Sequence, residues 1–234
     1  MYKMKSIILA SGFGARLYPL TIHKPKCLLE YKGKPIISHL VDKIPKQVDI
    51  LVTTNKKFEA HFRRWQKTLD REITVCVEPV FSEEQSFGAV GSLHYWVTTA
   101  NITDDLLVLA GDNYFEFGLT NFASAYNRKN TLVAVCDIGD KSKASQFGVV
   151  QLDGHRIVGF DEKPVEPKST LVVTACYLLP VRVFPLLSEF VRKGKADNLG
   201  SFIAYLSKVD EVHAYVFAEL WLDIGNIDTY YSTR

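Results

Sequence analysis

The fold is decided by the stretch Ile7-Ile8-Leu9-Ala10-Ser11-Gly12-Phe13-Gly14-Ala15-Arg16, where an apolar run passes directly into a glycine-rich turn. The run has no polar face, which predicts a strand buried on both sides. The two glycines permit positive φ and a close approach of the backbone to a ligand, and successive N–H groups in such a turn form a concave anion site. Arg16 adds a planar, permanently charged fork suited to phosphate oxygens. We therefore expect the first strand to lead into a loop that holds a polyphosphate.

This turn alone does not identify a nucleotide site, and a tight turn without a ligand remains an alternative. The third glycine of the dinucleotide-binding fingerprint is missing, as is the Gly-Lys-Ser/Thr ending of a P-loop. Lys26 favours the phosphate interpretation, because it stands between Pro25 and the apolar run Cys27-Leu28-Leu29 and supplies a second cation near the loop.

The composition narrows the class of protein. The 234 residues are 47% hydrophobic and 23% charged, which is typical of a globular chain with a sizeable core. A net charge of +2 gives no reason to expect a nucleic-acid partner. The four cysteines are far apart without a C-x-x-C pair, so we expect a reduced, cytoplasmic protein. No cleavage site follows the first apolar run and no run reaches membrane-spanning length, so we expect neither a leader nor a membrane association.

Strands and helices alternate along the first 130 residues. Apolar runs predict strands over 50–52, 73–77 and 106–110, and helical spacing predicts helices over 36–44, 56–69 and 93–97. This order is typical of a doubly wound, mostly parallel, Rossmann-like α/β sheet. From residue 131 the chain is richer in strands, predicted over 131–136, 147–152, 156–160, 171–177 and 212–217, with helices over 183–191 and 202–206 and a turn over 195–200. We expect this inserted β-rich subregion to lay a second layer on the first half.

Two aspartates follow predicted strands directly. Asp112 stands in Gly111-Asp112-Asn113, and Asp223 stands in Trp221-Leu222-Asp223-Ile224-Gly225. Ligands bind at the carboxyl ends of strands in such sheets, so both acids are candidate site residues, although each could instead cap a turn. The six histidines are scattered without metal-ligand spacing.

Five motifs in fixed order resemble the sugar-nucleotide pyrophosphorylases, the nucleoside triphosphate:sugar-1-phosphate nucleotidyltransferases. They are the glycine loop with Lys26, the loop at Gly88, Gly111-Asp112-Asn113, the unit from Phe147-Gly148-Val149-Val150 to Glu162-Lys163-Pro164, and Trp221-Leu222-Asp223-Ile224-Gly225. Together they cover most of the chain, and the likeness is closest to a short glucose-1-phosphate thymidylyltransferase. The resemblance implies one domain over 1–234, with a nucleotide-binding half (1–130) and a sugar-binding half (131–234).

The resemblance also implies a role for each matching position. The catalytic residues would be Arg16, Lys26, Asp112 and Lys163. The nucleotide would contact Leu9, Ser11, Gly12, Gly14, Glu83, Gln85 and Gly88, with Ser11 standing where the family usually has Ala or Gly. The sugar would contact Asn113, Gly148, Glu162, Lys163 and Thr174, and Asp112 and Asp223 would hold Mg²⁺. The substrates would be a nucleoside triphosphate and a sugar 1-phosphate, with pyrophosphate released.

The base-reading position departs from the thymidylyltransferase pattern. Five residues before Gly88 the long thymidylyltransferases present a Gln, and here a gapless count finds Glu83. A carboxylate only accepts hydrogen bonds, so it suits the two adjacent donors of guanine, as in the mannose-1-phosphate guanylyltransferases. Gln85 lies two residues on and could meet a pyrimidine instead. The other motifs favour dTTP or UTP with glucose 1-phosphate, which we keep slightly ahead.

Two other classes of function remain open. A dinucleotide-dependent oxidoreductase would use Gly12-Phe13-Gly14, but no acid ends the second strand, which closes with Thr53-Thr54-Asn55. A non-catalytic sensor of nucleotide sugars would keep the fold but not the metal acids. The chain ends soon after Gly225 and shows no hexapeptide repeats, so we expect a short form without an acyltransferase half, and a possible homo-oligomer.

Overall fold

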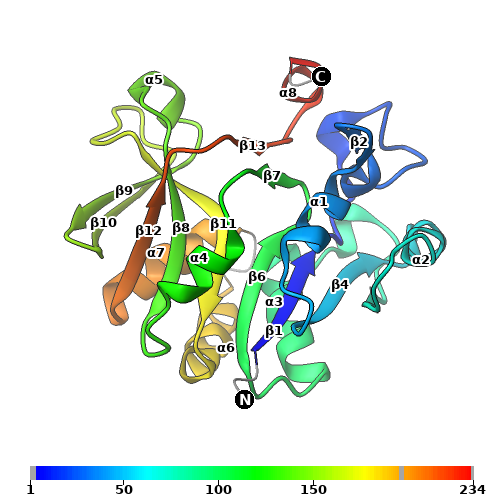
Figure 1. Cartoon of the computed structure of the whole chain (residues 1–234), viewed down its shortest axis with the longest axis horizontal. Coiled ribbons are helices and arrows are strands. Elements are labelled where there is room, and N and C mark those ends of the chain that lie inside the picture. The colour runs from blue at the N-terminus through cyan, green and yellow to red at the C-terminus, as the bar shows by residue number, and fades with distance from the viewer. Residues whose placement is uncertain (1–3, 195–197, 233–234) are drawn as a thin grey trace.

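The computed structural model describes residues 4–194 and 198–232, and nine strands within these ranges form one mixed sheet (Figure 1). Across the sheet the order is β5 (Thr74–Glu78), β4 (Asp49–Asn55), β1 (Met4–Leu9), β6 (Asp105–Ala110), β11 (Leu171–Leu179), β8 (Thr131–Asp137), β12 (Val212–Phe217), β10 (Arg156–Glu162) and β9 (Gly148–Asp153). Strands β5, β4, β1 and β6 are parallel, and so are β8 and β12, whereas β11 is antiparallel to both of its neighbours. The expected Rossmann-like α/β class is confirmed.

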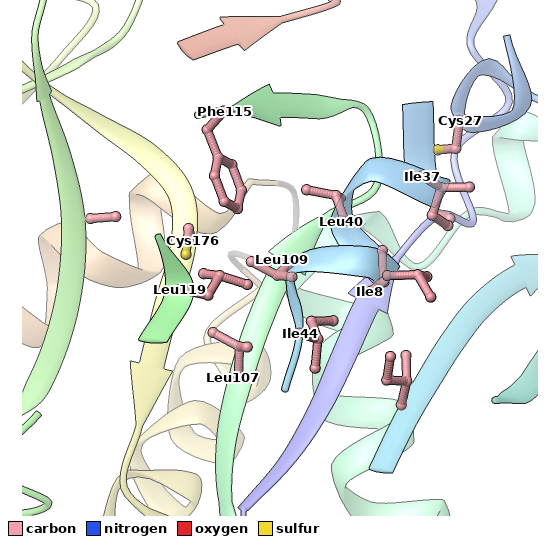
Figure 2. Close-up of a cluster of buried hydrophobic side chains, with 14 of the residues drawn as sticks. Ile8, Cys27, Ile37, Leu40, Ile44, Leu107, Leu109, Phe115, Leu119 and Cys176 are labelled. Carbon is pink, nitrogen blue, oxygen red and sulfur yellow. The ribbon is translucent and has the colours of Figure 1, made fainter. Parts of the chain in front are cut away.

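Helices cover both faces of the sheet, because the central strands alternate their buried side chains between two cores. On β1, Ile8 faces one core and Ile7 the other; on β6, Leu107 and Leu109 face the first core and Leu106 and Val108 the second. The first core, part of which Figure 2 shows, receives α1 (Ile36–Lys43), α2 (Glu59–Gln66) and α4 (Leu119–Ser124). The second core receives α3 (Gly88–Thr99), α6 (Phe184–Arg192) and α7 (Leu199–Val209).

The β-rich second half does not lie on the first half as a layer. Its strands continue the same sheet, because β11 inserts between β6 and β8 and pairs with both. The pairing of strands that are far apart in the sequence depends on the whole chain, so the apolar pattern predicted the strands but not their neighbours.

Two short ladders stand above the carboxyl ends of the central strands. The first pairs β7 (Asn113–Phe115) with β13 (Trp221–Asp223), which lie side by side in Figure 1, and the second pairs β2 (Glu30–Tyr31) with β3 (Lys34–Pro35). After β13 comes α8 (Ile227–Ser232), whose Tyr230 belongs to a third apolar cluster with Leu17 and Leu29. This cluster joins the end of the described chain to the segment after the glycine loop.

The remaining elements are short. They are α5 (Lys141–Ala144) and the 3₁₀ helices η1 (Ala15–Leu17), η2 (Lys26–Leu28), η3 (Glu83–Gln85) and η4 (Val181–Val183). Residues 195–197 of the predicted 195–200 turn lie outside the described residues, and α7 begins after Asn198, whose side chain accepts a hydrogen bond from the Ser201 N–H. In the part of the chain described, no helix is long and apolar enough to cross a membrane.

Candidate active site

The glycine loop follows β1 and turns back at Gly14. Gly14 has φ +69°, and a Cβ there would lie 3.3 Å from the Lys26 and Thr21 side chains. The Thr21 hydroxyl donates to the Gly14 carbonyl at 2.7 Å. Both the left-handed backbone and the close neighbours require glycine at this position, and the turn brings Lys26 beside the loop.

Two cavities open at the carboxyl ends of the central strands. The first, of about 410 Å³, is bounded by the glycine loop and the start of α3, and its lining includes Leu9, Ser11, Gly12, Gly14, Lys26, Glu83, Gly88 and Ser92. The second, of about 740 Å³, lies toward β9–β11, and its lining includes Asn113, Gly148, Glu162, Lys163, Trp221 and Asp223. Arg16, Asp112 and Gly225 line both cavities, so Asp112 stands where they meet.

Lys26 and Asp112 form a buried ion pair at this junction. The Lys26 Nζ lies 2.6 Å from the Asp112 Oδ2, and Lys26 is only 8% exposed. Burial alone would lower the pKa of Lys26, but the carboxylates of Asp112 and Asp223 outweigh it and raise that pKa. Burial likewise opposes ionisation of Asp112, yet Lys26 holds the pKa of Asp112 below its usual value. Both groups are therefore charged in the folded chain.

The short β7–β13 ladder brings Asp223 to Asp112. Asp223 pairs in register with Asn113, and the Ile224 N–H donates to the Asp112 carbonyl at 3.2 Å. Burial, and then the Asp112 carboxylate, raises the pKa of Asp223 to about 6. Two acids from distant parts of the sequence are thus held close enough to repel each other.

This pair of carboxylates fits Mg²⁺ better than a metal that needs a full protein cage. Among the described residues no group of three or more His, Cys, Asp or Glu side chains could hold a metal ion. Mg²⁺ usually takes one or two carboxylates and completes its shell with water and substrate phosphates. Arg16 and Lys26 could meet the phosphates that such a shell requires.

In the second cavity, Gly148 is required by a close packing contact. A Cβ there would lie 2.6 Å from the Phe160 ring and 3.2 Å from the Glu162 Oε2. The Lys163 N–H donates to the Phe147 carbonyl at 3.0 Å, which holds the Glu162-Lys163 turn beside the start of β9. Burial raises the pKa of Glu162 against the opposing charge of Lys163. A carboxylate and an ammonium therefore face one cavity together.

A family model described as "Nucleotidyl transferase" matches residues 5–234. The chain belongs to the nucleotidyl transferase family. Within the family, a Sulfolobus acidocaldarius protein provisionally named mannose-1-phosphate guanyltransferase is 29% identical over 95% of this chain and 60% of its own length. The bifunctional protein GlmU of Methanocaldococcus jannaschii is 30% identical over 95% of this chain and 51% of its own length. This nucleotidyl transferase chain thus spans half to three fifths of those relatives.

A solved structure of the same family confirms the fold. It comes from Bacillus anthracis, is provisionally named glucose-1-phosphate thymidylyltransferase and was determined with sucrose. It superposes with a TM-score of 0.86 at 26% identity, covering 98% of this chain and 93% of the other. The predicted relationship to the sugar-nucleotide pyrophosphorylases is confirmed.

Most of the predicted site residues line the two cavities, but the polar groups of three side chains are hydrogen-bonded within the protein. Gln85 Oε1 accepts from the Phe81 N–H at 2.9 Å and so stabilises its own loop. Thr174 is 1% exposed and donates to the Ala134 carbonyl at 2.8 Å, because alternate residues of β11 face opposite sides of the sheet and Val173 and Ala175 are the ones at the cavity. Asn113 lines the second cavity, but both ends of its amide are hydrogen-bonded within the protein.

Asn113 lies between the Trp221 indole and the Asp112 carboxylate. Its Oδ1 accepts from the Trp221 Nε1 at 2.7 Å, and its Nδ2 donates to the Asp112 Oδ1 at 2.9 Å. Because an indole N–H can only donate, the amide oxygen must face Trp221 and the amide N–H must face Asp112. Asn113 therefore orients Asp112.

The sequence reasoning gave no role to Glu78, Ser92 or Trp221. Glu78 ends β5 and is 1% exposed. The signal that singled out Asp112, an acid at the end of a strand in a parallel sheet, also applies to Glu78. Glu78 directly follows the predicted strand over 73–77, where this signal could have found it.

Proposed function

We propose that the chain transfers a nucleotidyl group from a nucleoside triphosphate to a sugar 1-phosphate. An oxygen of the sugar phosphate attacks the α-phosphorus, the bond from that phosphorus to the oxygen bridging to the β-phosphorus breaks, and pyrophosphate leaves. The single observation that carries this proposal is the meeting of two cavities at Asp112 and Arg16. A transfer between two bound molecules needs two adjacent compartments with the reacting charges between them.

The nucleotide is proposed to occupy the cavity between the glycine loop and α3. The loop N–H groups and Arg16 would bind the β- and γ-phosphates, and Arg16 would then hold the leaving pyrophosphate by paired hydrogen bonds. Lys26 stands beside Asp112 at the junction and would stabilise charge on the α-phosphate.

The sugar 1-phosphate is proposed to occupy the second cavity. Lys163 would bind its phosphate, while Glu162 and the Gly148 backbone would bind sugar hydroxyls. The attacking phosphate oxygen is already ionised near neutral pH, so no general base is needed. Alignment and charge stabilisation are sufficient for this chemistry.

Asp112 and Asp223 are proposed to hold Mg²⁺. When bound, the ion would neutralise phosphate charge as it moves toward the pyrophosphate. Asn113 and Lys26 keep the Asp112 carboxylate in one orientation, and the β7–β13 ladder fixes the distance to Asp223.

Pyrophosphate release tests the proposal directly. The chain is incubated with Mg²⁺ and with each pairing of dTTP, UTP, GTP or ATP with glucose 1-phosphate or mannose 1-phosphate. We expect release only when both substrates are present. Nucleotide-sugar binding without release from any pairing would favour the sensor alternative.

The choice of base divides two candidates within this function. The name of the Bacillus anthracis relative supports dTTP with glucose 1-phosphate. Glu83, however, lines the nucleotide cavity while Gln85 is bound within its own loop, and this observation favours GTP with mannose 1-phosphate. The catalytic efficiency kcat/KM for dTTP, UTP and GTP in wild type and in Glu83→Gln decides between them, since Glu83→Gln should reduce use of GTP only if Glu83 accepts from guanine.

A further inference from the structure

Glu78 is a buried acid with three neutral hydrogen-bond donors. It is 1% exposed, and its Oε1 accepts from the Ser11 hydroxyl at 2.5 Å, from the Ser92 hydroxyl and from the Trp96 indole at 3.3 Å. Within the described residues no Lys or Arg pairs with it. A buried carboxylate is costly unless strong hydrogen bonds satisfy it, so this arrangement requires that the donors stay in place.

The two serines come from two different elements that line the nucleotide cavity, and their hydroxyls meet at the same Glu78 oxygen. Ser11 lies in the glycine loop, Ser92 lies in α3, and both line the cavity of about 410 Å³. Glu78 is not part of that lining and lies behind both hydroxyls. One oxygen of Glu78, placed behind the cavity surface, therefore joins the glycine loop to α3.

The glycine-loop end of this contact is itself fixed to β4. The Ser11 and Thr53 hydroxyls lie 2.7 Å apart in a hydrogen bond, and the Ala10 N–H donates to the Thr53 hydroxyl at 3.0 Å. The Asn55 amide donates to the Ser11 carbonyl at 2.8 Å. Because a carboxylate only accepts, the Ser11 hydroxyl must donate to Glu78 and accept from the Thr53 hydroxyl. The serine in this turn thus has a defined partner and is not merely a small residue.

We propose that Glu78 is a positioning residue that joins the glycine loop to α3 and so fixes the position of the loop relative to the helix, the two elements that line the nucleotide cavity. The inference rests on the proposed function, since it concerns the same nucleotide cavity. A glycine loop that is held against α3 before the nucleotide binds does not have to be ordered on binding, so the entropic cost of binding is smaller. Loss of either hydroxyl contact opens the clamp, which makes the two serines interdependent.

Direct binding of nucleotide tests the clamp. Dissociation constants for dTTP, UTP and GTP are measured by calorimetry in wild type, Glu78→Leu and Glu78→Gln. We expect Glu78→Leu to weaken binding about ten-fold, the size of losing a hydrogen bond to a charged group. Glu78→Gln keeps an acceptor oxygen and should bind at least three-fold more tightly than Glu78→Leu. The KM for sugar 1-phosphate should not change in either variant.

Two further sets of variants separate positioning from general stability. Ser38→Ala removes a buried hydrogen bond from the Trp65 indole, of 2.9 Å, far from the nucleotide cavity, and should lower the Tm without changing nucleotide binding. Ser11→Ala and Ser92→Ala should each weaken binding several-fold in wild type, and the double variant should be no weaker than the poorer single variant. If Glu78→Leu fails to fold, the comparison of the two single serine variants with the double variant still tests the clamp.

The outcomes distinguish the clamp from the proposed function. Wild-type chain that binds none of the three nucleotides would overturn both. Two results would overturn the clamp alone, provided that the wild-type chain binds nucleotide. One is a double serine variant whose loss of affinity equals the product of the two single losses. The other is a Glu78→Leu variant that, like Ser38→Ala, lowers the Tm without changing nucleotide affinity.

Discussion

The two aspartates of the site differ in what each does for the folded chain. Asp112 neutralises the buried ammonium of Lys26, whereas Asp223 adds a second negative charge beside Asp112. Removing Asp112 takes the nearest counter-charge from the buried ammonium of Lys26. Removing one of two like charges relieves repulsion.

Asp112→Asn should therefore destabilise the metal-free chain by about 3 kcal/mol, while Asp223→Asn should stabilise it by about 1 kcal/mol. Both variants should lose turnover equivalent to about 3–4 kcal/mol of transition-state stabilisation. Urea unfolding without metal and pyrophosphate release with Mg²⁺ measure the two effects. Asp42→Asn, in an exposed ion pair with Lys34, is the matched control and should change neither. Equal stability changes in Asp112→Asn and Asp223→Asn would contradict this account of the site.

The cations of the two cavities should affect different substrates. Lys163→Ala should mainly raise the KM for sugar 1-phosphate, because Lys163 lines only the second of the two cavities that meet at Asp112. Arg16→Ala should mainly impair the triphosphate side and the reverse reaction with pyrophosphate. Arg16→Lys should restore only part of that loss, since a point charge lacks the paired donors. Steady-state kinetics in both directions provide the readout, and a normal sugar-phosphate KM in Lys163→Ala would refute its assignment.

At the scale of elements, β13 has an effect beyond carrying Asp223. Its Trp221 packs edge-on against Phe147 at a centroid separation of 5.0 Å and donates to Asn113, so β13 connects the start of β9 with the carboxylate of Asp112. Trp221→Phe keeps the aromatic packing but removes the indole N–H that holds the Asn113 amide oxygen.

We expect Trp221→Phe to weaken metal binding about ten-fold, since an Asn113 side chain that is no longer held at its oxygen can rotate away from Asp112. Binding of Mn²⁺, followed by electron paramagnetic resonance, measures this without relying on turnover. Trp65→Phe, which removes a remote indole hydrogen bond, is the control and should leave Mn²⁺ affinity unchanged. Unaltered Mn²⁺ affinity in Trp221→Phe would show that Asn113 does not need the indole.

The elements themselves were largely predictable, because each central strand is a continuous apolar run and each long helix carries its own apolar face. The position of β11 between β6 and β8 was not predictable, since pairing between distant segments leaves no local trace. The same contrast between local and long-range information applies to the residues of the candidate site. Glycine turns and acids at strand ends marked Gly14 and Asp112, whereas the direction in which Thr174 points depends on a strand register that only the folded sheet defines.

At the scale of the whole molecule, activity should depend on metal while the fold should not. The two cores consist of apolar side chains on either side of the sheet, with no part of the proposed metal pair among them. Excess chelator should abolish pyrophosphate release and leave the far-UV circular dichroism spectrum unchanged, and added Mg²⁺ should restore release. Full turnover in excess chelator would refute the proposed role of Asp112 and Asp223.

The β7–β13 ladder also has a consequence for the order of events during synthesis. Asp112 leaves the ribosome about a hundred residues before Asp223 and β13, the strand that pairs with β7. Until β13 emerges, a triphosphate held by the glycine loop, as proposed above, would meet a nascent chain that lacks its second acid. The bound triphosphate would then stand beside Asp112 without Asp223. In the proposed mechanism the centre would be complete only once β13 docks, so transfer of the nucleotidyl group would have to wait for that step.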